Sequence, residues 1–414
     1  MLPYGRHSIS EEDIEAVVRS LRSDFLTCGP EVEAFEQGFT AFVGAKHAVA
    51  VCNATAALHL AMRVLGIGQG DRVVTSPNTF VASANAAAYV GATPDFSDID
   101  PKSYNLDPWE LERNWKPDTK AVVAVDYAGQ PCNMPEIARI ARSRGAYVIE
   151  DACHGTGGGF AAYGKKWKLG AHPWADMTTF SFHPVKTLTT GEGGILLTEN
   201  EEWAAKARLL RTHGITRTSD AFTGIADAAV QASNFESPLL EKGPWYYEMQ
   251  DLGYNYRITD LQCALGRSQL QRLPEFITRR QQIASSYNQA FSNLDWLKTP
   301  ALAPWLLYPA ENSLLKTENL ISWHLYTLQI DFPRLGNTRT EVMQNLREKG
   351  VGTQVLYIPV YLQPWYRRTY GYAPGKCPNA EAFYASALSL PLYPGMTDAD
   401  VEKVIDAVHR LKKN

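Results

Sequence analysis

Residues 121–152 read AVVAVDYAGQPCNMPEIARIARSRGAYVIEDA, and this stretch decides the fold. It begins with a short apolar run rich in valine, which predicts a buried strand. Residues 134–145 then show the spacing of an amphipathic helix and end in a glycine, as helix C-termini often do. A second apolar run follows at 146–152. Strand, helix and strand in this order predict a parallel βαβ unit.

The same alternation continues on both sides of this unit. Apolar runs at 47–53, 71–77, 177–182 and 193–200 predict further strands, and 54–66 and 79–91 predict helices that end in glycine. We therefore expect a mainly parallel sheet with helices on both faces. Ligands of such sheets bind at the carboxyl ends of the strands. The polar residues expected at those ends are Asn53, Thr55, Ser76, Asn78, Asp126, Tyr127, Asp151, His154 and Ser181.

The remainder of the chain is less regular. Residues 212–253 predict a long loop, and loops of that length are usually functional or mobile. Residues 259–291 predict a long helix, with a kink or break at Pro274. Strands are expected at 323–331 and 350–357, and helices at 338–350 and 397–411. These patterns predict a large domain over 1–270 and a smaller one over 271–414.

Composition narrows the class of protein. The chain has 414 residues, a formal net charge of −4 and six scattered cysteines without CxxC spacing. The mild charge and the lack of a basic block argue against binding of nucleic acid. We expect no membrane span and no signal peptide, and reduced thiols in a cytoplasmic protein.

Lys186 is the most unusual residue. It lies in SFHPVKTLTTGEGG, residues 181–194, on a short loop between two predicted buried strands. An ammonium group is costly there unless it is paired or neutralised. A Schiff base would neutralise it, so Lys186 is a candidate covalent catalyst. The alternative is a solvated loop lysine.

Other residues fit the same site. Asp151 can keep a pyridine nitrogen protonated, as pyridoxal 5′-phosphate (PLP) requires, and NATAAL at 53–58 can bind a phosphate at a helix N-terminus. Ser181 adds a hydroxyl donor, and Phe80 is placed to cover the cofactor ring. Taken singly, each has a structural interpretation that is favoured: Asp151 as a helix N-cap or buried ion-pair partner, NATAAL as an ordinary cap of an alanine-rich helix, and Phe80 as a core residue. The histidines fit no metal-ligand spacing, so no metal is expected.

Four longer stretches carry a family resemblance: 26–61, EDACHGTGG at 150–158, FSFHPVKTLTTGEGG at 180–194, and LGYNYRITDLQCALG at 252–266. With them, the chain resembles the DegT/StrS nucleotide-sugar aminotransferases over nearly its whole length. The resemblance implies an α/β PLP-dependent transferase of fold type I. Its large domain would be a three-layer αβα sandwich around a mainly parallel seven-stranded sheet, and its smaller C-terminal domain α+β. It also implies a homodimer with shared active sites.

Site residues follow from the matched motifs. Lys186 would bind PLP covalently, Asp151 would pair with the pyridine nitrogen, and His154 would lie beside the phenolic oxygen. The resemblance assigns Thr55, Ala56 and Ser181 to the phosphate, Phe80 to the ring face, and Asn255 to the phosphate of the partner's site. Weaker substrate candidates are Tyr127, His183, Arg211, His213, His324, Tyr326 and Tyr357. The family usually has glycine where this chain has Ala54, and 217–246 is poorly covered by the family pattern.

The shorter stretches VDYAGQPCNM and PLYPGMT resemble the transaminases of pseudaminic acid biosynthesis within this family. This implies amino transfer from L-glutamate to C4 of a UDP-4-keto-6-deoxy-N-acetylhexosamine, giving UDP-4-amino-4,6-dideoxy-N-acetyl-β-L-altrosamine. Other UDP- or dTDP-4-keto-6-deoxy sugars, as in bacillosamine, viosamine or perosamine formation, remain open. A sugar dehydratase of the same fold would have histidine in place of Lys186, and a non-catalytic relative would be expected to lose Lys186 or Asp151.

Overall fold

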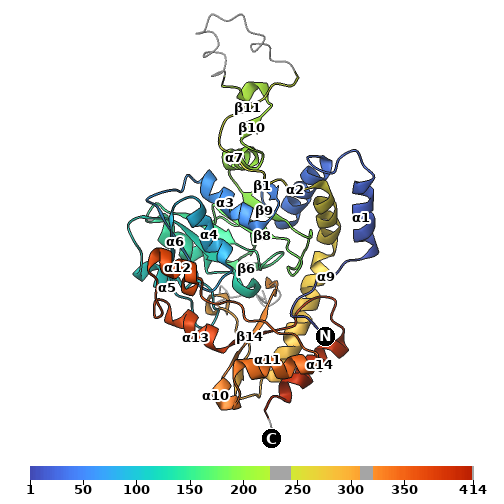
Figure 1. Cartoon of the computed structure of the whole chain (residues 1–414), viewed down its shortest axis with the longest axis vertical. Coiled ribbons are helices and arrows are strands. Elements are labelled where there is room, and N and C mark those ends of the chain that lie inside the picture. The colour runs from blue at the N-terminus through green and yellow to red at the C-terminus, as the bar shows by residue number, and fades with distance from the viewer. Residues whose placement is uncertain (224–243, 308–319, 413–414) are drawn as a thin grey trace, which may run out of the picture.

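The computed structural model describes residues 1–223, 244–307 and 320–412. A seven-stranded sheet in the order β1-β9-β8-β5-β4-β2-β3 forms its centre (Figure 1). Strands β2 to β5 and β8 run parallel, and β9 is antiparallel to both β1 and β8. The strands are β1 (His47–Val51), β2 (Arg72–Thr75), β3 (Thr93–Phe96), β4 (Thr119–Val125), β5 (Tyr147–Asp151), β8 (Met177–Ser181) and β9 (Gly194–Thr198). The mainly parallel sheet predicted from the sequence is confirmed; β3 is the strand that the prediction missed.

Helices cover both faces of this sheet. The side chains of β4 alternate between the faces: Val122 joins the apolar cluster that includes Ile137, whereas Val123 joins the cluster that includes Leu58. Two separate cores on one sheet give the three-layer αβα arrangement. The helices of this part are α2 (Pro30–Val43), α3 (Ala54–Val64), α4 (Val81–Tyr89), α5 (Pro108–Arg113), α6 (Met134–Arg142) and α7 (Glu201–Arg211).

Helix α9 (Asp260–Phe291) connects the sheet to the C-terminal part of the chain. Of the predicted kink or break at Pro274, the break is wrong, because the helix continues through this residue. Proline removes one backbone hydrogen bond, but burial of Leu273 and Phe276 on either side of it holds the helix in place. The predicted boundary at residue 270 falls inside α9, and the division into two domains stays a prediction.

The C-terminal part has an antiparallel sheet of β12 (Leu297–Lys298), β13 (Tyr326–Ile330) and β14 (Ala387–Leu390). Its helices are α10 (Phe332–Leu335), α11 (Arg339–Glu348), α12 (Pro364–Tyr370), α13 (Pro378–Ser386) and α14 (Asp398–His409). The strand predicted at 350–357 does not form a ladder. It makes only single bridges, from Val351 to Leu2 and from Gln354 to Ser389. The end of the segment, Leu356 and Tyr357, lines a cavity that is described below.

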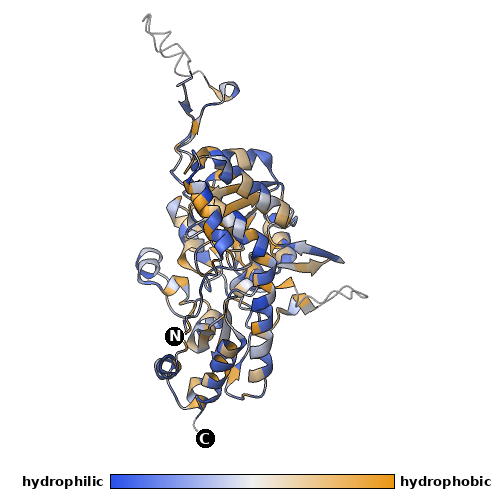
Figure 2. Ribbon diagram, turned by 90° about the vertical axis from the view of Figure 1, so that its right-hand side faces the viewer, coloured by the Kyte–Doolittle hydropathy of each residue, from blue (hydrophilic) through white to orange (hydrophobic). Residues whose placement is uncertain are grey.

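One further α-helix and two strand pairs complete the α-helices and strands of the described residues. Helix α1 (Glu11–Leu21) packs on α9, and β6 (Gly159–Ala162) pairs with β7 (Lys165–Lys168). Strands β10 (Ile215–Thr216) and β11 (Glu248–Met249) form an arm that projects from the body within the predicted long loop (Figures 1 and 2). Residues 224–243 of that loop lie outside the described residues. No helix in the described part of the chain is long and apolar enough to cross a membrane.

Candidate active site

A cavity of about 510 Å³ opens at the carboxyl ends of β4, β5 and β8. This is the edge of the sheet at which the sequence predicts a ligand site. The lining residues come from the N-termini of α3 and α4, from three strand ends, and from two distant segments. They are Tyr4, Asn53, Ala54, Thr55, Leu58, Thr79, Phe80, Ala82, Ser83, Val125, Asp151, Cys153, His154, Ser181, His183, Val185, Lys186, Glu192, Leu356 and Tyr357.

Lys186 lines this cavity from the loop after β8. A backbone hydrogen bond from Lys186 N to His183 O, 2.9 Å, closes the turn that carries it. Burial lowers the pKa of Lys186 below its ordinary value, against the opposing influence of the Cys153 thiol and the Asp151 carboxylate. A lysine in this state is more often neutral, which is the form that acts as a nucleophile or base.

Asp151 is the last residue of β5 and is almost completely buried, with 4% of its surface exposed. Its Oδ2 accepts a hydrogen bond of 2.6 Å from Ser83 Oγ, and its Oδ1 accepts one of 3.2 Å from Cys153 N. Ser83 Oγ in turn lies 2.7 Å from Thr79 Oγ1. Ser83 was not predicted from the sequence. Thr79 and Ser83 lie four residues apart at the start of an alanine-rich helix, a spacing that brings two hydroxyl groups together.

The N-terminus of α3 forms a second side of the cavity. Asn53 caps the helix by accepting a hydrogen bond of 2.9 Å from Ala56 N, which leaves the N–H groups of the first helical residues for a ligand. Ser181 pairs with Gly194 in the sheet, and Gly194 lies so close to α3 that a Cβ there would be 2.5 Å from Ala54 N. The missing side chain thus brings the Ser181 hydroxyl next to the helix N-terminus.

The structure bears on two residues of α3 that the sequence singled out, Ala56 and Ala54. Ala56 does not line the cavity, and its N–H is already bonded to Asn53, so it is a poor phosphate ligand. The family usually has glycine where this chain has Ala54, and alanine tolerates a positive φ less well than glycine. Ala54 is the first residue of α3 and is not among the residues with positive φ, so alanine fits there without strain.

Five more predicted residues line the cavity: Thr55, Phe80, His154, His183 and Tyr357. Burial, together with the charge of Lys186, lowers the pKa of His154 well below its ordinary value. Phe80 is 57% exposed at the N-terminus of α4, and its ring centroid lies 6.3 Å from that of Tyr357. These side chains add an aromatic wall to a site whose other walls are polar.

Three of the predicted substrate contacts are instead buried outside the cavity. Tyr127 Oη donates to Leu356 O at 2.6 Å, and Tyr326 Oη donates to Asn288 Oδ1 at 2.6 Å. His324 is 5% exposed and its ring packs against that of His154, with centroids 4.6 Å apart and an interplanar angle of 50°. Tyr127 thus joins the sheet to the C-terminal part, and Tyr326 joins β13 to α9.

Three further predicted residues lie on or after α7 and do not line the cavity of this chain. Arg211 Nη1 is bonded to Glu36 Oε1 and to Ala50 O, each at 2.7 Å, so it ties α7 to α2 and β1. His213 and Asn255 are exposed. Tyr4 was not predicted from the sequence; it lines the cavity, and Leu392 N donates to Tyr4 O at 3.1 Å.

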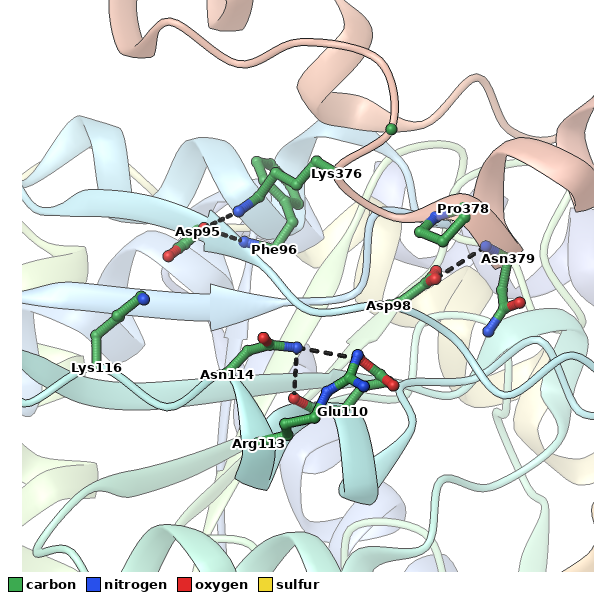
Figure 3. Close-up of a pocket in the computed structure, with 11 residues that line it drawn as sticks. Asp95, Phe96, Asp98, Glu110, Arg113, Asn114, Lys116, Lys376, Pro378 and Asn379 are labelled. Carbon is green, nitrogen blue, oxygen red and sulfur yellow. Dashed lines mark hydrogen bonds and ion pairs between the residues drawn. The ribbon is translucent and has the colours of Figure 1, made fainter.

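A second pocket of about 380 Å³ lies beside β3 and α5 (Figure 3). Most of its charged side chains have protein partners: Lys376 Nζ lies 2.8 Å from Asp95 Oδ1, Arg113 Nη2 lies 2.6 Å from Glu110 Oε2, and Asp98 Oδ2 accepts a hydrogen bond of 2.8 Å from Asn379 N. The bonds of Lys376 and Asn379 attach the start of α13 to the sheet. These polar groups of the pocket therefore have a structural role, and the pocket is not a second candidate active site.

The larger cavity fits PLP by the chemistry of its groups. It combines the amine of Lys186, the carboxylate of Asp151, and a helix N-terminus next to the hydroxyl of Ser181. An amine suits the cofactor's aldehyde, a carboxylate its pyridine nitrogen, and the helix end with the hydroxyl its phosphate. Those three features were predicted from the sequence, and the structure brings them to one place.

Comparisons with known proteins agree with this chemistry. The DegT/DnrJ/EryC1/StrS aminotransferase family matches residues 7–409. Spore coat polysaccharide biosynthesis protein SpsC of Bacillus subtilis is 42% identical over 413 residues, 100% of this chain and 97% of that protein.

Solved structures agree over the same length. PseC of Helicobacter pylori, an aminotransferase involved in pseudaminic acid biosynthesis, has 28% identity and a TM-score of 0.84, with 99% of each chain covered. The PLP form of Spr1654 from Streptococcus pneumoniae has 26% identity and a TM-score of 0.83, with 99% of this chain and 98% of that one covered. The chain therefore belongs to the DegT/DnrJ/EryC1/StrS aminotransferase family and is a PLP-dependent transaminase.

Proposed function

We propose that this transaminase moves an amino group from L-glutamate to C4 of a UDP-4-keto-6-deoxy-N-acetylhexosamine. The observation that carries the transfer is the placement of Lys186, Asp151 and the α3 N-terminus around one cavity. The choice of sugar rests on the likeness to PseC and on the stretches that resemble transaminases of pseudaminic acid biosynthesis.

The chain's own residues divide the work. Lys186 would hold the cofactor through Nζ and, once freed by the amino donor, move the proton at the reacting carbon, since burial favours its neutral amine. Asp151, fixed by Ser83, would keep the ring nitrogen charged, and α3 with Ser181 would hold the phosphate. When bound, PLP supplies the electron sink that makes this carbon acidic. The amino donor reacts first and the keto sugar second, each in its own half-reaction, and this order predicts ping-pong kinetics.

A second substrate class is also supported by an observation. The relative with 42% identity is a spore coat polysaccharide biosynthesis protein, whereas PseC is 28% identical. A different UDP- or dTDP-4-keto-6-deoxy sugar, destined for a polysaccharide, is therefore the alternative acceptor. A dehydratase is the weaker reading, because Lys186 is present and lines the cavity.

We also infer a homodimer with shared active sites. Asn255, which the family resemblance assigns to the partner's phosphate site, is exposed and does not line the cavity of its own chain. A residue placed in this way can serve a site only across an interface between copies.

The first experiment supplies PLP, L-glutamate and UDP-2-acetamido-2,6-dideoxy-β-L-arabino-hexos-4-ulose to the purified protein. Mass spectrometry should detect the aminated sugar. If L-glutamate bleaches the visible absorbance of the cofactor but this sugar is not aminated, the donor stands and the acceptor is another 4-keto sugar. If L-glutamate changes nothing, the proposed donor is wrong.

Lys186→Ala should lower the rate of amination by several orders of magnitude and leave the fold intact, because it removes the group that holds the cofactor and moves the proton. Circular dichroism checks the fold, and product formation checks the rate. Lys206→Ala is the matched control, since Lys206 bonds only to Val64 O among the described residues, far from the lining of the cavity. A near-native rate in Lys186→Ala would refute the assigned role.

A further inference from the structure

His154 has both ring nitrogens engaged. The N–H of Ala128 points at Nδ1 from 3.3 Å, and the hydroxyl of Tyr357 lies 3.2 Å from Nε2. A backbone N–H can only donate, so Nδ1 must be the acceptor. Burial also lowers the pKa of His154 well below its ordinary value, which keeps the ring neutral. The single ring proton is therefore on Nε2.

This tautomer sets the direction of the next hydrogen bond. Because His154 Nε2 carries the proton, it donates to Tyr357 Oη, and the hydroxyl oxygen is the acceptor. The proton of Tyr357 is then free to donate elsewhere. Among the described residues, the Tyr357 hydroxyl has no other hydrogen-bond partner, and the residue lines the cavity beside Lys186.

The surroundings hold Tyr357 in this position. The preceding carbonyl, Leu356 O, accepts a hydrogen bond of 2.6 Å from Tyr127 Oη, and the Tyr357 ring lies nearly parallel to that of His154, at an interplanar angle of 22°. Burial raises the pKa of Tyr357 well above its ordinary value, so the hydroxyl keeps its proton. Tyr127, which does not line the cavity itself, thus supports the residue that does.

We propose that Tyr357 donates a hydrogen bond to an oxygen of the molecule bound in the cavity, with His154 as the positioning residue that turns the hydroxyl proton inward. The acceptor is either the ring oxygen of the cofactor or the carbonyl oxygen of the keto sugar, and both offer the same chemistry. Tyr357 stabilises charge on that oxygen without transferring a proton. The sugar alternative rests on the proposed function, whereas the cofactor alternative does not.

Tyr357→Phe removes the donor and keeps the ring, so it is the central variant. Three quantities are measured in parallel: cofactor affinity by reconstitution of the apoprotein, the pH titration of the cofactor's visible absorbance, and the rates of the two half-reactions. Weaker cofactor binding by roughly tenfold with a shifted absorbance titration identifies the cofactor oxygen. Wild-type binding and absorbance, with roughly tenfold slowing of the keto-sugar half-reaction alone, identify the substrate carbonyl.

Tyr366→Phe is the matched control. This variant also deletes a buried tyrosine hydroxyl, which is bonded to Asn85 Oδ1 at 2.6 Å. Because Tyr366 does not line the cavity, the variant should leave all three quantities unchanged. If Tyr357→Phe likewise matches the wild type in all three, the proposal is overturned. If the wild type aminates no keto sugar, the proposed function fails. Unchanged affinity and absorbance in Tyr357→Phe would then overturn this proposal by themselves.

Variants of His154 test its positioning role. His154→Gln keeps one acceptor and one donor and should retain most of the wild-type values, whereas His154→Leu should reproduce the Tyr357→Phe defect. In the Tyr357→Phe background, His154→Leu should add little, because the two residues act through one hydroxyl. A full additional loss in the double variant would show that His154 acts on the bound molecule directly, which would contradict the positioning role.

Discussion

Asp151 depends on a neighbour that no motif marks. Its carboxylate is buried in the cavity wall, and the 2.6 Å hydrogen bond from Ser83 Oγ fixes one of its oxygens. A buried carboxylate that loses such a donor gains rotational freedom and an unsatisfied acceptor. Catalysis is sensitive to this because the group that supports the cofactor must stay in place.

Ser83→Ala should therefore reduce the rate of amination by roughly tenfold without unfolding the protein. Steady-state kinetics measure the rate, and circular dichroism monitors the fold. Ser286→Ala, on an exposed turn of α9, is the control and should behave as the wild type. Equal rates in the two variants would mean that Asp151 is held well enough by the backbone alone.

His324 predicts a pH dependence of stability. Its pKa lies well below the ordinary value of 6.5, first because of burial and then because of the positive charge of Lys186. Below about pH 6.5 the unfolded chain binds a proton on this ring that the folded chain does not. The free energy of unfolding should thus fall as the pH falls from 7 to 5, by up to about 1.4 kcal/mol per pH unit from this residue.

His324→Leu isolates that contribution, because other groups keep their own pH dependence in both proteins. Urea denaturation of the apoprotein at pH 7, 6 and 5 should give a shallower loss of stability for the variant than for the wild type. A slope equal to that of the wild type would mean that the ring is protonated in the folded protein as readily as in the unfolded chain.

At the scale of elements, the contact between β9 and α3 decides where a phosphate can sit. Gly194 allows the strand to approach the helix N-terminus, and an added Cβ would lie 2.5 Å from both Ala54 N and Asn53 C. These are backbone atoms, which cannot move aside cheaply. The close approach is what places Ser181 beside the first turn of α3.

Gly194→Ala should lower stability by roughly 1–3 kcal/mol and weaken cofactor binding, because α3 must shift away from the strand. Thermal unfolding and titration of the apoprotein with PLP measure the two effects. Gly38→Ala is the control: its Cβ would meet only Leu270 Cδ2, at 3.5 Å, so α2 should be as stable or more stable. Wild-type cofactor binding by Gly194→Ala would place the phosphate elsewhere.

At the scale of the whole molecule, the active site is incomplete within one chain if the inferred dimer is correct. Lys186 lines the cavity, whereas Asn255 is exposed outside it. In a symmetric dimer, one mixed pair of Lys186→Ala and Asn255→Ala chains contains one site with both native residues.

Under this model, Lys186→Ala and Asn255→Ala should each be nearly inactive alone. Mixing them after reversible dissociation should restore about a quarter of the wild-type activity, since half of the dimers are mixed and each has one complete site. Analytical ultracentrifugation checks that dimers have formed. Each variant mixed with itself is the control and should stay inactive. Dimers that form without any recovery would contradict the role of Asn255 across the interface.

Many secondary-structure elements of this protein can be predicted from local sequence patterns. The runs that became β4 and β5, the helix between them, and the loop around Lys186 are short-range features, because side-chain periodicity and terminal glycines act within a few residues. Polar residues after parallel strands must meet at one sheet edge, which is why Asp151, His154 and Ser181 were predicted together. Lys186 belongs to the same group for the same reason.

Contacts between distant segments were beyond that reasoning. Tyr4 was not predicted, and it reaches the cavity because the N-terminal residues and residues 350–357 pack together. Tyr357, which only the family resemblance named, enters the cavity through the same contact. Arg211 proved to be an ion-pair partner of Glu36. The direction of the hydrogen bond from His154 to Tyr357 depends on Ala128 N, which folding brings to the ring. Local preferences set the elements and the edge where the site lies, but packing of remote segments decides which side chains enter it and which way their protons point.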